Sequence, residues 1–451
     1  MTATEASTAA SSIIRPGVSQ SGMMREYIKR YRDPEERKKA HPVMLDIMPE
    51  TYGVMVYQED VIKVAHYFGG LTLAEADKLR RGMSGKFRSR EEFLQVKQLF
   101  FDNCKQKGEP ESLTEDVWRQ IESFAGYAFA KGHSASYAVE SYQSLFLKAY
   151  YPLEYMVATI NNFGGFYRTE LYVNEARMHG AIIEAPCINT SFNEAYIKDK
   201  TIYLGFMFLN ALESKVVKRF LIERQNHGHF KSLDDFIDRV PISIEQLSIL
   251  IKTNAFRFTG VNKRELLWEA HLKINKVSFE EHIITLFKTE KINYKTPKLP
   301  STFLENAFDD IELLDFPLCN PFDLLQNPSK HPLKATQLPD YVGKIVSIEG
   351  YLITTKNTVT KNQQIMYFGT FIDREGYFID TVHFTPSAAK FPFKGKGVYT
   401  ITGKVLEDFD CVNIEVSHMK REPIIEDPRY AVNSSNPTFQ NKKSFKDHKL
   451  I

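Results

Sequence analysis

Apolar side chains recur at helical spacing through most of residues 52–162. In "YQEDVIKVAHYFGG", residues 57–70, five apolar side chains fall on one side of a helix, and two glycines end it. We expect this side to face a core. Its members are Val61, Ile62, Val64, Ala65 and Phe68.

Three polar stretches predict where further helices begin. "TLAE" at residues 72–75, "SREE" at 89–92 and "SLTE" at 112–115 each place a Glu three residues after a Ser or Thr, which is the capping-box pattern. A long helix is expected to follow Ser134, and Pro152 should break or restart it. One stripe of that helix carries Ala138, Tyr142, Leu145, Phe146 and Ala149.

The pattern changes to strand spacing in residues 341–422. Five β-rich runs are separated by turns: "KIVSIEGYLITT", "QQIMYFGTFID", "FIDTVHFT", "GVYTITGKVLE" and "CVNIEVSHM". Five short strands within so few residues predict a small barrel or sandwich.

Between these regions the pattern is less uniform. Residues 165–205 are mixed, with a short strand in "TIYLGF", and residues 211–272 return to helices. Residues 273–340 are rich in Pro and Asn and predict a linker with short helices. The start, "MTATEASTAASS", and the polar tail after residue 422 are expected to be disordered.

Composition excludes several classes of protein. The 451 residues carry a formal net charge of only +2, so a basic surface has to be local. No apolar run is long enough to span a membrane, and the start lacks a secretory pattern. The four cysteines show no metal-ligand spacing, which favours a reducing compartment without disulfides or zinc. They are Cys104, Cys187, Cys319 and Cys411.

The first candidate site is basic. Residues 78–107 contain nine Lys and Arg against three Asp and Glu. Arg80, Arg81 and Lys86 cluster around a predicted helix end, where guanidinium groups could grip phosphate oxygens. The alternative is a solvated basic face without a ligand.

The second candidate is "FAGYAFAKGHSASYAVESYQ", residues 124–143. Lys131, His133 and Ser134 precede a predicted helix N-terminus, which attracts anions through its free N–H groups. The alternative is an ordinary loop with Ser134 as the helix N-cap. Together the two stretches suggest a site for a triphosphate or a nucleic-acid phosphate.

The third candidate is the surface of the predicted barrel. Aromatic side chains beside lysines suit the stacking of unpaired bases over a basic groove. The alternative, which applies to at least half of the aromatics, is that they alternate into the core. The candidates are Tyr351, Lys356, Lys361, Tyr367, Phe368 and Phe371.

No catalytic or metal-binding residue emerges from the spacing. Phosphoryl transfer to a hydroxyl needs metals held by clustered carboxylates. Asp408 and Asp410 fit a surface turn, and Asp234 and Asp235 fit the first turn of a helix. His227 and His229 flank a glycine in a predicted loop.

The quoted motifs resemble a known family. "RPGVSQSGM", "TYGVMVYQEDVIKVAHYFGG", "EADKLRRGM" and "FAGYAFAKGHSASYAVESYQSLFLKAYYPLEYM" follow in the order seen in the fingers of the bacterial DNA polymerase III alpha subunit. The resemblance covers residues 14–422 and is densest up to residue 160. It implies a multidomain α+β fold with helical fingers, a helix-hairpin-helix region and a five-stranded OB-type barrel. The implied divisions are a leader (1–13), fingers (14–162), a helix-hairpin-helix region (163–272), a linker (273–340), an OB-fold (341–422) and a tail (423–451).

The resemblance also implies a function. Arg80, Arg81, Lys86 and the residues Lys131, His133 and Ser134 would face the phosphates of an incoming dNTP. The partners would be primer-template DNA, single-stranded template, a palm-bearing polymerase portion, a sliding clamp and other replisome subunits, in the bacterial cytoplasm and without a membrane. Mg²⁺ is expected only in a complete polymerase, held by palm residues that have no match here.

The chain departs from the family pattern in several places. Ala128, Ala130 and Gly132 stand where Gly, Asn and Ser are usual, and Asn210 and Ala211 replace the paired glycines of the hairpin. "HIITLF", residues 282–287, lacks the Gln usual in a clamp-binding peptide. These differences are similar to those of a second, error-prone type of alpha polymerase. Two alternatives stay open: a non-catalytic single-stranded-DNA-binding module, or a truncated gene product.

Overall fold

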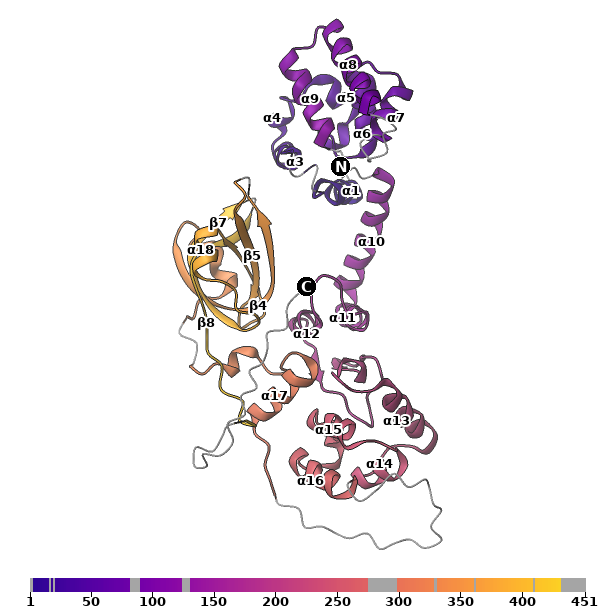
Figure 1. Ribbon diagram of the computed structural model, residues 1–451, viewed down its shortest axis with the longest axis vertical. Coiled ribbons are helices and arrows are strands. Elements are labelled where there is room, and N and C mark those ends of the chain that lie inside the picture. The colour runs from indigo at the N-terminus through magenta and orange to yellow at the C-terminus, as the bar shows by residue number, and fades with distance from the viewer. Residues whose placement is uncertain are drawn as a thin grey trace. The chain divides into compact units, whose positions relative to one another are not determined.

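We describe a computed structural model of the chain. It covers residues 3–15, 18, 21–81, 90–123, 130–274, 298–327, 331–360, 362–408 and 410–430. The chain divides into two compact units, Met1–Tyr151 and Pro152–Ile451, and each is described by itself. Most regular elements in both units are helices, and the C-terminal part of the second unit forms a β-barrel (Figure 1). This confirms the predicted α+β class.

The regular elements described in the first unit are all helical. Its described helices are α1 (Ala3–Ile13), α3 (Met23–Arg32), α4 (Pro34–Arg37), α5 (Pro42–Ile47), α6 (Gln58–Lys63), α7 (Leu73–Arg81), α8 (Arg90–Gln106), α9 (Glu111–Ser123) and α10 (Lys131–Tyr150). A π-helical turn, Val64–Phe68, continues α6.

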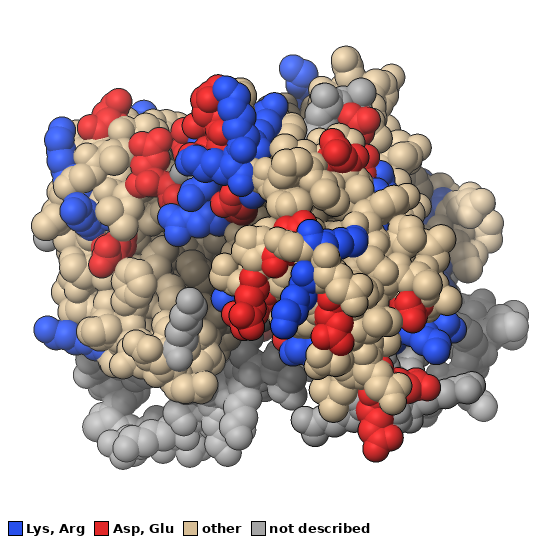
Figure 2. All heavy atoms as spheres, turned by 90° about the horizontal axis from the view of Figure 1, so that it is seen from above, with Lys and Arg blue, Asp and Glu red and all other residues tan. Residues whose placement is uncertain are grey.

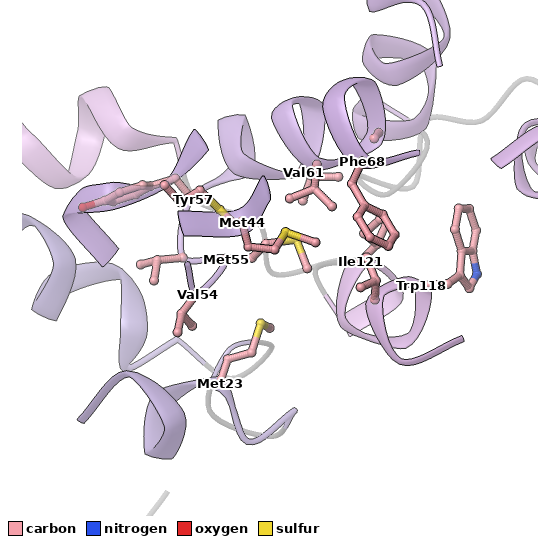
Figure 3. Packing of buried hydrophobic residues seen from close by; sticks show 14 of the residues in the cluster. Met23, Met44, Val54, Met55, Tyr57, Val61, Phe68, Trp118 and Ile121 are labelled. Atoms are coloured by element: carbon pink, nitrogen blue, oxygen red, sulfur yellow. The ribbon is translucent and has the colours of Figure 1, made fainter. Parts of the chain in front are cut away.

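The core of this unit forms where the sequence predicted it. Val61, Val64, Ala65 and Phe68 are fully buried, whereas Ile62 is only partly buried (Figure 3). Gly69 stops the helix and also leaves room for a neighbour, since a Cβ there would lie 2.2 Å from the Phe100 ring. The glycine pair therefore ends a helix and allows an aromatic side chain to pack.

The helix starts match the prediction only in part. At "TLAE" the Thr72 N–H donates to Glu75 Oε2 (2.8 Å) and the Glu75 N–H donates to Thr72 Oγ1 (3.3 Å), which confirms that capping box. Ser89 of "SREE" lies outside the described residues. The prediction for "SLTE" is wrong, because α9 begins at Glu111 and Ser112 lies inside it.

The expected disordered leader is also wrong. Residues 3–13 form α1, which packs against α10 and buries Ala9, Ser12 and Ile13. Small and polar side chains allow this close approach of two helices, so a segment of low hydrophobicity becomes ordered by a tertiary contact.

The second unit begins with helices around a small sheet. The helices are α11 (Pro152–Asn161), α12 (Thr169–Met178), α13 (Ser214–His227), α14 (Leu233–Arg239), α15 (Ile244–Lys252), α16 (Lys263–Ile274) and α17 (Phe303–Leu314). The sheet has the order β1 (Ile182–Glu184), β3 (Thr201–Tyr203), β2 (Tyr196–Lys198). The strand expected in "TIYLGF" is β3.

Residues predicted as a linker take part in this core. Leu313 and Leu314 of α17 pack with Phe220 and Phe236, and Asp309 of α17 forms a buried ion pair with Lys263. The tail also returns to α17, where Arg429 pairs with Asp309 and Glu312 at 2.5 Å each. The expectation of a disordered tail is therefore wrong for residues 423–430.

The five predicted strands form a closed barrel. Its strands are β4 (Ile345–Val359), β5 (Ile365–Ile372), β6 (Phe378–His383), β7 (Val398–Asp408) and β8 (Cys411–Arg421), with α18 (Thr385–Lys390) between β6 and β7. The order β4-β5-β6-β8-β7 closes through the β4–β7 pair. This order and the helix after the third strand agree with the expected OB-type barrel.

The chain carries nearly equal numbers of basic and acidic side chains, 58 Lys and Arg against 56 Asp and Glu. On the face shown in Figure 2, Lys and Arg side chains lie among Asp and Glu side chains, in line with the small net charge. Among the described helices, none has the length and apolar character needed to cross a membrane.

Candidate nucleotide and nucleic-acid interface

Arg80 and Arg81 lie in the last turn of α7 and share one acidic partner. Arg80 Nε and Nη2 donate to Asp77 Oδ1 at 2.9 and 2.8 Å, and Arg81 Nη2 lies 3.0 Å from Asp77 Oδ2. The hydrogen bond from Arg80 lowers the pKa of Asp77. The Arg81 side chain is 60% exposed and keeps donors that a ligand can reach. Lys86 lies outside the described residues.

Lys131 opens α10 and is held by two carboxylates. Its backbone N–H donates to Glu59 Oε2 at 2.9 Å, and its ammonium pairs with Glu50 and lies 5.4 Å from the centre of the Tyr57 ring. The helix thus begins at Lys131, four residues earlier than predicted, with Ala130 and not Ser134 in the N-cap position. His133 is exposed in the first turn.

Ser134 is neither an N-cap nor exposed. It is fully buried, its hydroxyl pairs with that of Ser12 on α1, and it lies 3.4 Å from the Ala130 carbonyl oxygen. The reason is that α1 packs over this turn, which the sequence pattern did not reveal. In this conformation Ser134 holds two helices together and does not face a ligand.

Both candidate stretches of the first unit adjoin the same helix. α7 packs against α6, and α10 is tied to α6 through Glu59. The sequence pattern did not reveal Glu50 and Glu59. The only available signal was the acidic first turn of α6, which suits any helix N-terminus.

Two of the barrel aromatics are buried. Tyr351 packs against Leu171 and Phe322, and burial together with the nearby Glu170 raises its pKa. Phe371 is fully buried in the barrel core. Phe371 points into the barrel, whereas Tyr351 lies on the opposite face of its strand and is covered by α12, so the prediction that Tyr351 and Phe371 form a binding surface is wrong.

The other barrel candidates gather on the β4–β5 hairpin. Lys356 lies directly opposite Phe368, and the Phe368 side chain is 42% exposed. Tyr367 is partly buried and its ring centre lies 6.0 Å from that of Phe393. Lys361 lies outside the described residues. A cation and an aromatic ring thus share one face of the hairpin. Phe378 on the neighbouring strand β6 is also exposed; the alternation in "FIDTVH" could have predicted this, but Phe378 was not among the candidates.

The helix-hairpin-helix turn is satisfied internally. Ala211 has a left-handed backbone (φ 61°), the conformation that favours glycine. Gln246 Nε2 donates to the Ala211 carbonyl (2.9 Å), the Glu213 N–H donates to Gln246 Oε1 (2.7 Å), and the Asn210 N–H donates to the Leu313 carbonyl (2.8 Å). These contacts use backbone amides that such a turn could offer to a phosphate.

The acidic residues behave as predicted. Asp408 and Asp410 belong to the β7–β8 turn, Asp234 and Asp235 to the first turn of α14, and Gly228 follows the end of α13. Among the described residues, no three His, Cys, Asp or Glu side chains lie together as a metal site would require. All four cysteines are free thiols.

Two family models match the chain. Residues 5–108 match the bacterial DNA polymerase III alpha subunit finger domain, and residues 180–266 match a helix-hairpin-helix motif. The first match begins inside α1, in the segment expected to be an unrelated leader.

Relatives extend the similarity to nearly the whole chain. The DNA polymerase III subunit alpha of Borreliella burgdorferi is 29% identical over 96% of this chain and 39% of its own length. That of Buchnera aphidicola is 30% identical over 78% of this chain and 32% of its own. The error-prone DNA polymerase of Mycobacterium bovis is 31% identical over 57% of this chain and 24% of its own.

The chain thus spans about two fifths or less of the length of these relatives. Along the chain, the finger-domain match comes first, the helix-hairpin-helix match second and the barrel last. It belongs to the family of bacterial DNA polymerase III alpha-type proteins and corresponds to one part of them.

Proposed function

We propose that this chain is the part of a DNA-directed DNA polymerase that holds the incoming dNTP and the template during replication or repair synthesis. The observation that carries the proposal is the match of residues 5–108 to the polymerase finger domain. The helix-hairpin-helix match and the barrel that follow it support the same assignment.

The nucleotide would bind beside α6. Arg80, Arg81 and Lys131 would take the phosphates, with His133 and Lys86 as further cations. Guanidinium and ammonium groups are the donors that phosphate oxygens prefer. Ser134 contributes by fixing the first turn of α10 against α1.

The chemical step would be supplied by another polypeptide portion. The described residues do not fit a Mg²⁺ ion, because they bring no sufficient group of ligands together. We therefore assign no catalytic residue to this chain and derive no step through a metal. The proposed partners are a palm-bearing portion, the sliding clamp and other replisome subunits. The segment compared with a clamp-binding peptide, residues 282–287, lies outside the described residues.

The barrel would hold single-stranded template through its β4–β5 hairpin. Phe368 is placed to stack on a base, and Lys356 opposite it is placed to meet the phosphate backbone. The two positions are paired across the strands, so one nucleotide could contact both side chains.

The decisive experiment replaces Phe368 by Ala and measures the binding of a fluorescent oligothymidine by anisotropy. Since stacking contributes about 1–3 kcal/mol per base, we expect the dissociation constant to rise about 5- to 150-fold. Phe303→Ala is the matched control, because Phe303 is 53% exposed on α17 of the same unit. Equal affinities for the two variants would refute the role of the hairpin.

A second candidate is a DNA-binding module without a polymerase role. The closed barrel with its aromatic and cationic hairpin supports it. Such a module would bind single strands with a strong salt dependence but would not bind dNTP. A titration with a fluorescent dNTP analogue separates the two functions.

A further inference from the structure

The second half of α10 exposes an unusual amount of apolar surface. Tyr142 is 60% exposed, Leu145 63% and Phe146 49%, and all three belong to the apolar stripe that the sequence predicts; Tyr150, which follows that stripe, is 70% exposed. In its own unit, α10 buries only Ser134 and Ala138, both in its first half. Figure 1 shows α10 extending away from the other helices of its unit.

The apolar side chains occupy more than one side of the helix, and the remaining side carries Glu140, Ser144 and Lys148, spaced four residues apart. Leu145 and Leu147 are two positions apart, so they point to nearly opposite sides, and Leu147 is 45% exposed. A broad apolar face of a helix is normally covered by other protein. A flat surface would cover only one of these sides, whereas a groove covers several.

The charge pattern describes the surface that fits. Between residues 139 and 150 the only charged side chains are Glu140 and Lys148. The complementary surface is therefore an apolar groove with few charges. An exposed patch of this kind marks a protein interface.

We propose that α10 inserts into an apolar groove on the part of an alpha-type polymerase that this chain does not span. The extent of the relatives supports this occupant, since the matched regions leave 61% of the Borreliella burgdorferi protein uncovered. The inference rests on the proposed function and adds the docking element and the character of its partner.

The test places the photo-crosslinking amino acid p-benzoylphenylalanine at position 145 of the full chain, expressed in its source cells. The expected adduct contains a peptide whose sequence aligns with the uncovered part of the relatives. An adduct with a second copy of this chain, or with another part of residues 1–451, would overturn the proposal. So would the same adducts from a probe at Leu94, which is 53% exposed on α8.

A substitution gives an independent readout. With the probe at Tyr142, Leu145→Glu should reduce the adduct at least tenfold, because it puts a charge into an apolar groove. Leu94→Glu should leave the yield unchanged. Leu145 is exposed, so circular dichroism should show an unaltered helical content for both variants.

The two proposals can fail separately. A chain that binds dNTP and single-stranded DNA but forms no such adduct retains the proposed function and loses the docking element. A chain that forms the adduct but binds neither ligand retains the docking element and loses the proposed function.

Discussion

The groups of Lys131 that would meet a phosphate are already in contact with acids. Glu59 accepts from the Lys131 N–H, and Glu50 pairs with its ammonium. A triphosphate brings several negative charges to the same place. It must therefore displace these carboxylates or bind next to them against their repulsion.

We expect Glu50→Gln to strengthen triphosphate binding. Removing one negative charge at about 4 Å is worth about 1 kcal/mol in water, or about fivefold in affinity, and the gain should shrink as salt is added. Titration of a fluorescent dNTP analogue measures it. Glu36→Gln is the control, because it removes the same charge from the ion pair between Glu36 of α4 and Lys39. An unchanged affinity would place the triphosphate away from Lys131.

A second residue-scale effect concerns His383 in the barrel. It is fully buried, its Nε2 lies 2.9 Å from the Thr381 hydroxyl oxygen, and burial lowers its pKa from 6.5 to about 4. Because the unfolded chain binds this proton more readily, the stability present above pH 6.5 is lost as the pH falls towards 4.

His383→Gln should therefore make the barrel less sensitive to acid. Between pH 7 and pH 5 the wild-type chain should lose roughly 2 kcal/mol of unfolding free energy through this one group. Urea unfolding at pH 7 and pH 5 measures this loss of unfolding free energy. In the His383→Gln variant the loss should be smaller by roughly 2 kcal/mol. His229→Gln, at an exposed loop position, should behave like the wild type. Identical losses of unfolding free energy in the wild type and both variants would show that His383 does not cause the acid sensitivity.

At the scale of elements, the helix-hairpin-helix turn is held by one side chain from another helix. Gln246 of α15 is 9% exposed and bridges the Ala211 carbonyl and the Glu213 N–H. The turn therefore keeps its shape with an alanine in a left-handed conformation, where related sequences are expected to carry glycine.

Gln246→Ala should destabilise this turn by about 1–2 kcal/mol, because two backbone groups lose their partner. Urea unfolding of the second unit measures the effect. Gln98→Ala on α8, which removes a side-chain contact with the exposed Asp102, should cost less than about 0.5 kcal/mol. If Gln246→Ala also lowered the unfolding free energy by less than about 0.5 kcal/mol, water would be replacing the two hydrogen bonds of Gln246.

At the scale of the whole molecule, the two units have separate cores. The core cluster of the first unit lies within residues 9–121, and those of the second lie within residues 153–419. Units that share no core can unfold independently.

We expect calorimetry to resolve two unfolding transitions that respond to different ligands. A dNTP should raise the midpoint of the first unit, and single-stranded DNA should raise that of the second, since a ligand stabilises the unit that binds it. The His383→Gln variant identifies the barrel transition by its pH dependence. One transition shifted equally by both ligands would contradict this division.

Elements whose signals are local could be predicted from the amino-acid sequence alone. The stripe around Val61 and Phe68 forms a buried helix, the capping box at Thr72 forms as expected, and the five strands occur where period-two alternation appears. Burial of one face needs only regular spacing, so these elements can be predicted without knowing their neighbours. The family resemblance came from the same local motifs.

Which side chains a ligand can reach depends instead on how the helices and strands pack together. Ser134 is buried because α1 packs on it, Tyr351 because α12 packs on the barrel, and Lys131 is occupied because α6 brings Glu59 to it. The stripe of α10 shows the opposite outcome, since Tyr142 and Leu145 are not covered in their own unit. Exposure depends on contacts between segments far apart in sequence, and no local pattern records those contacts.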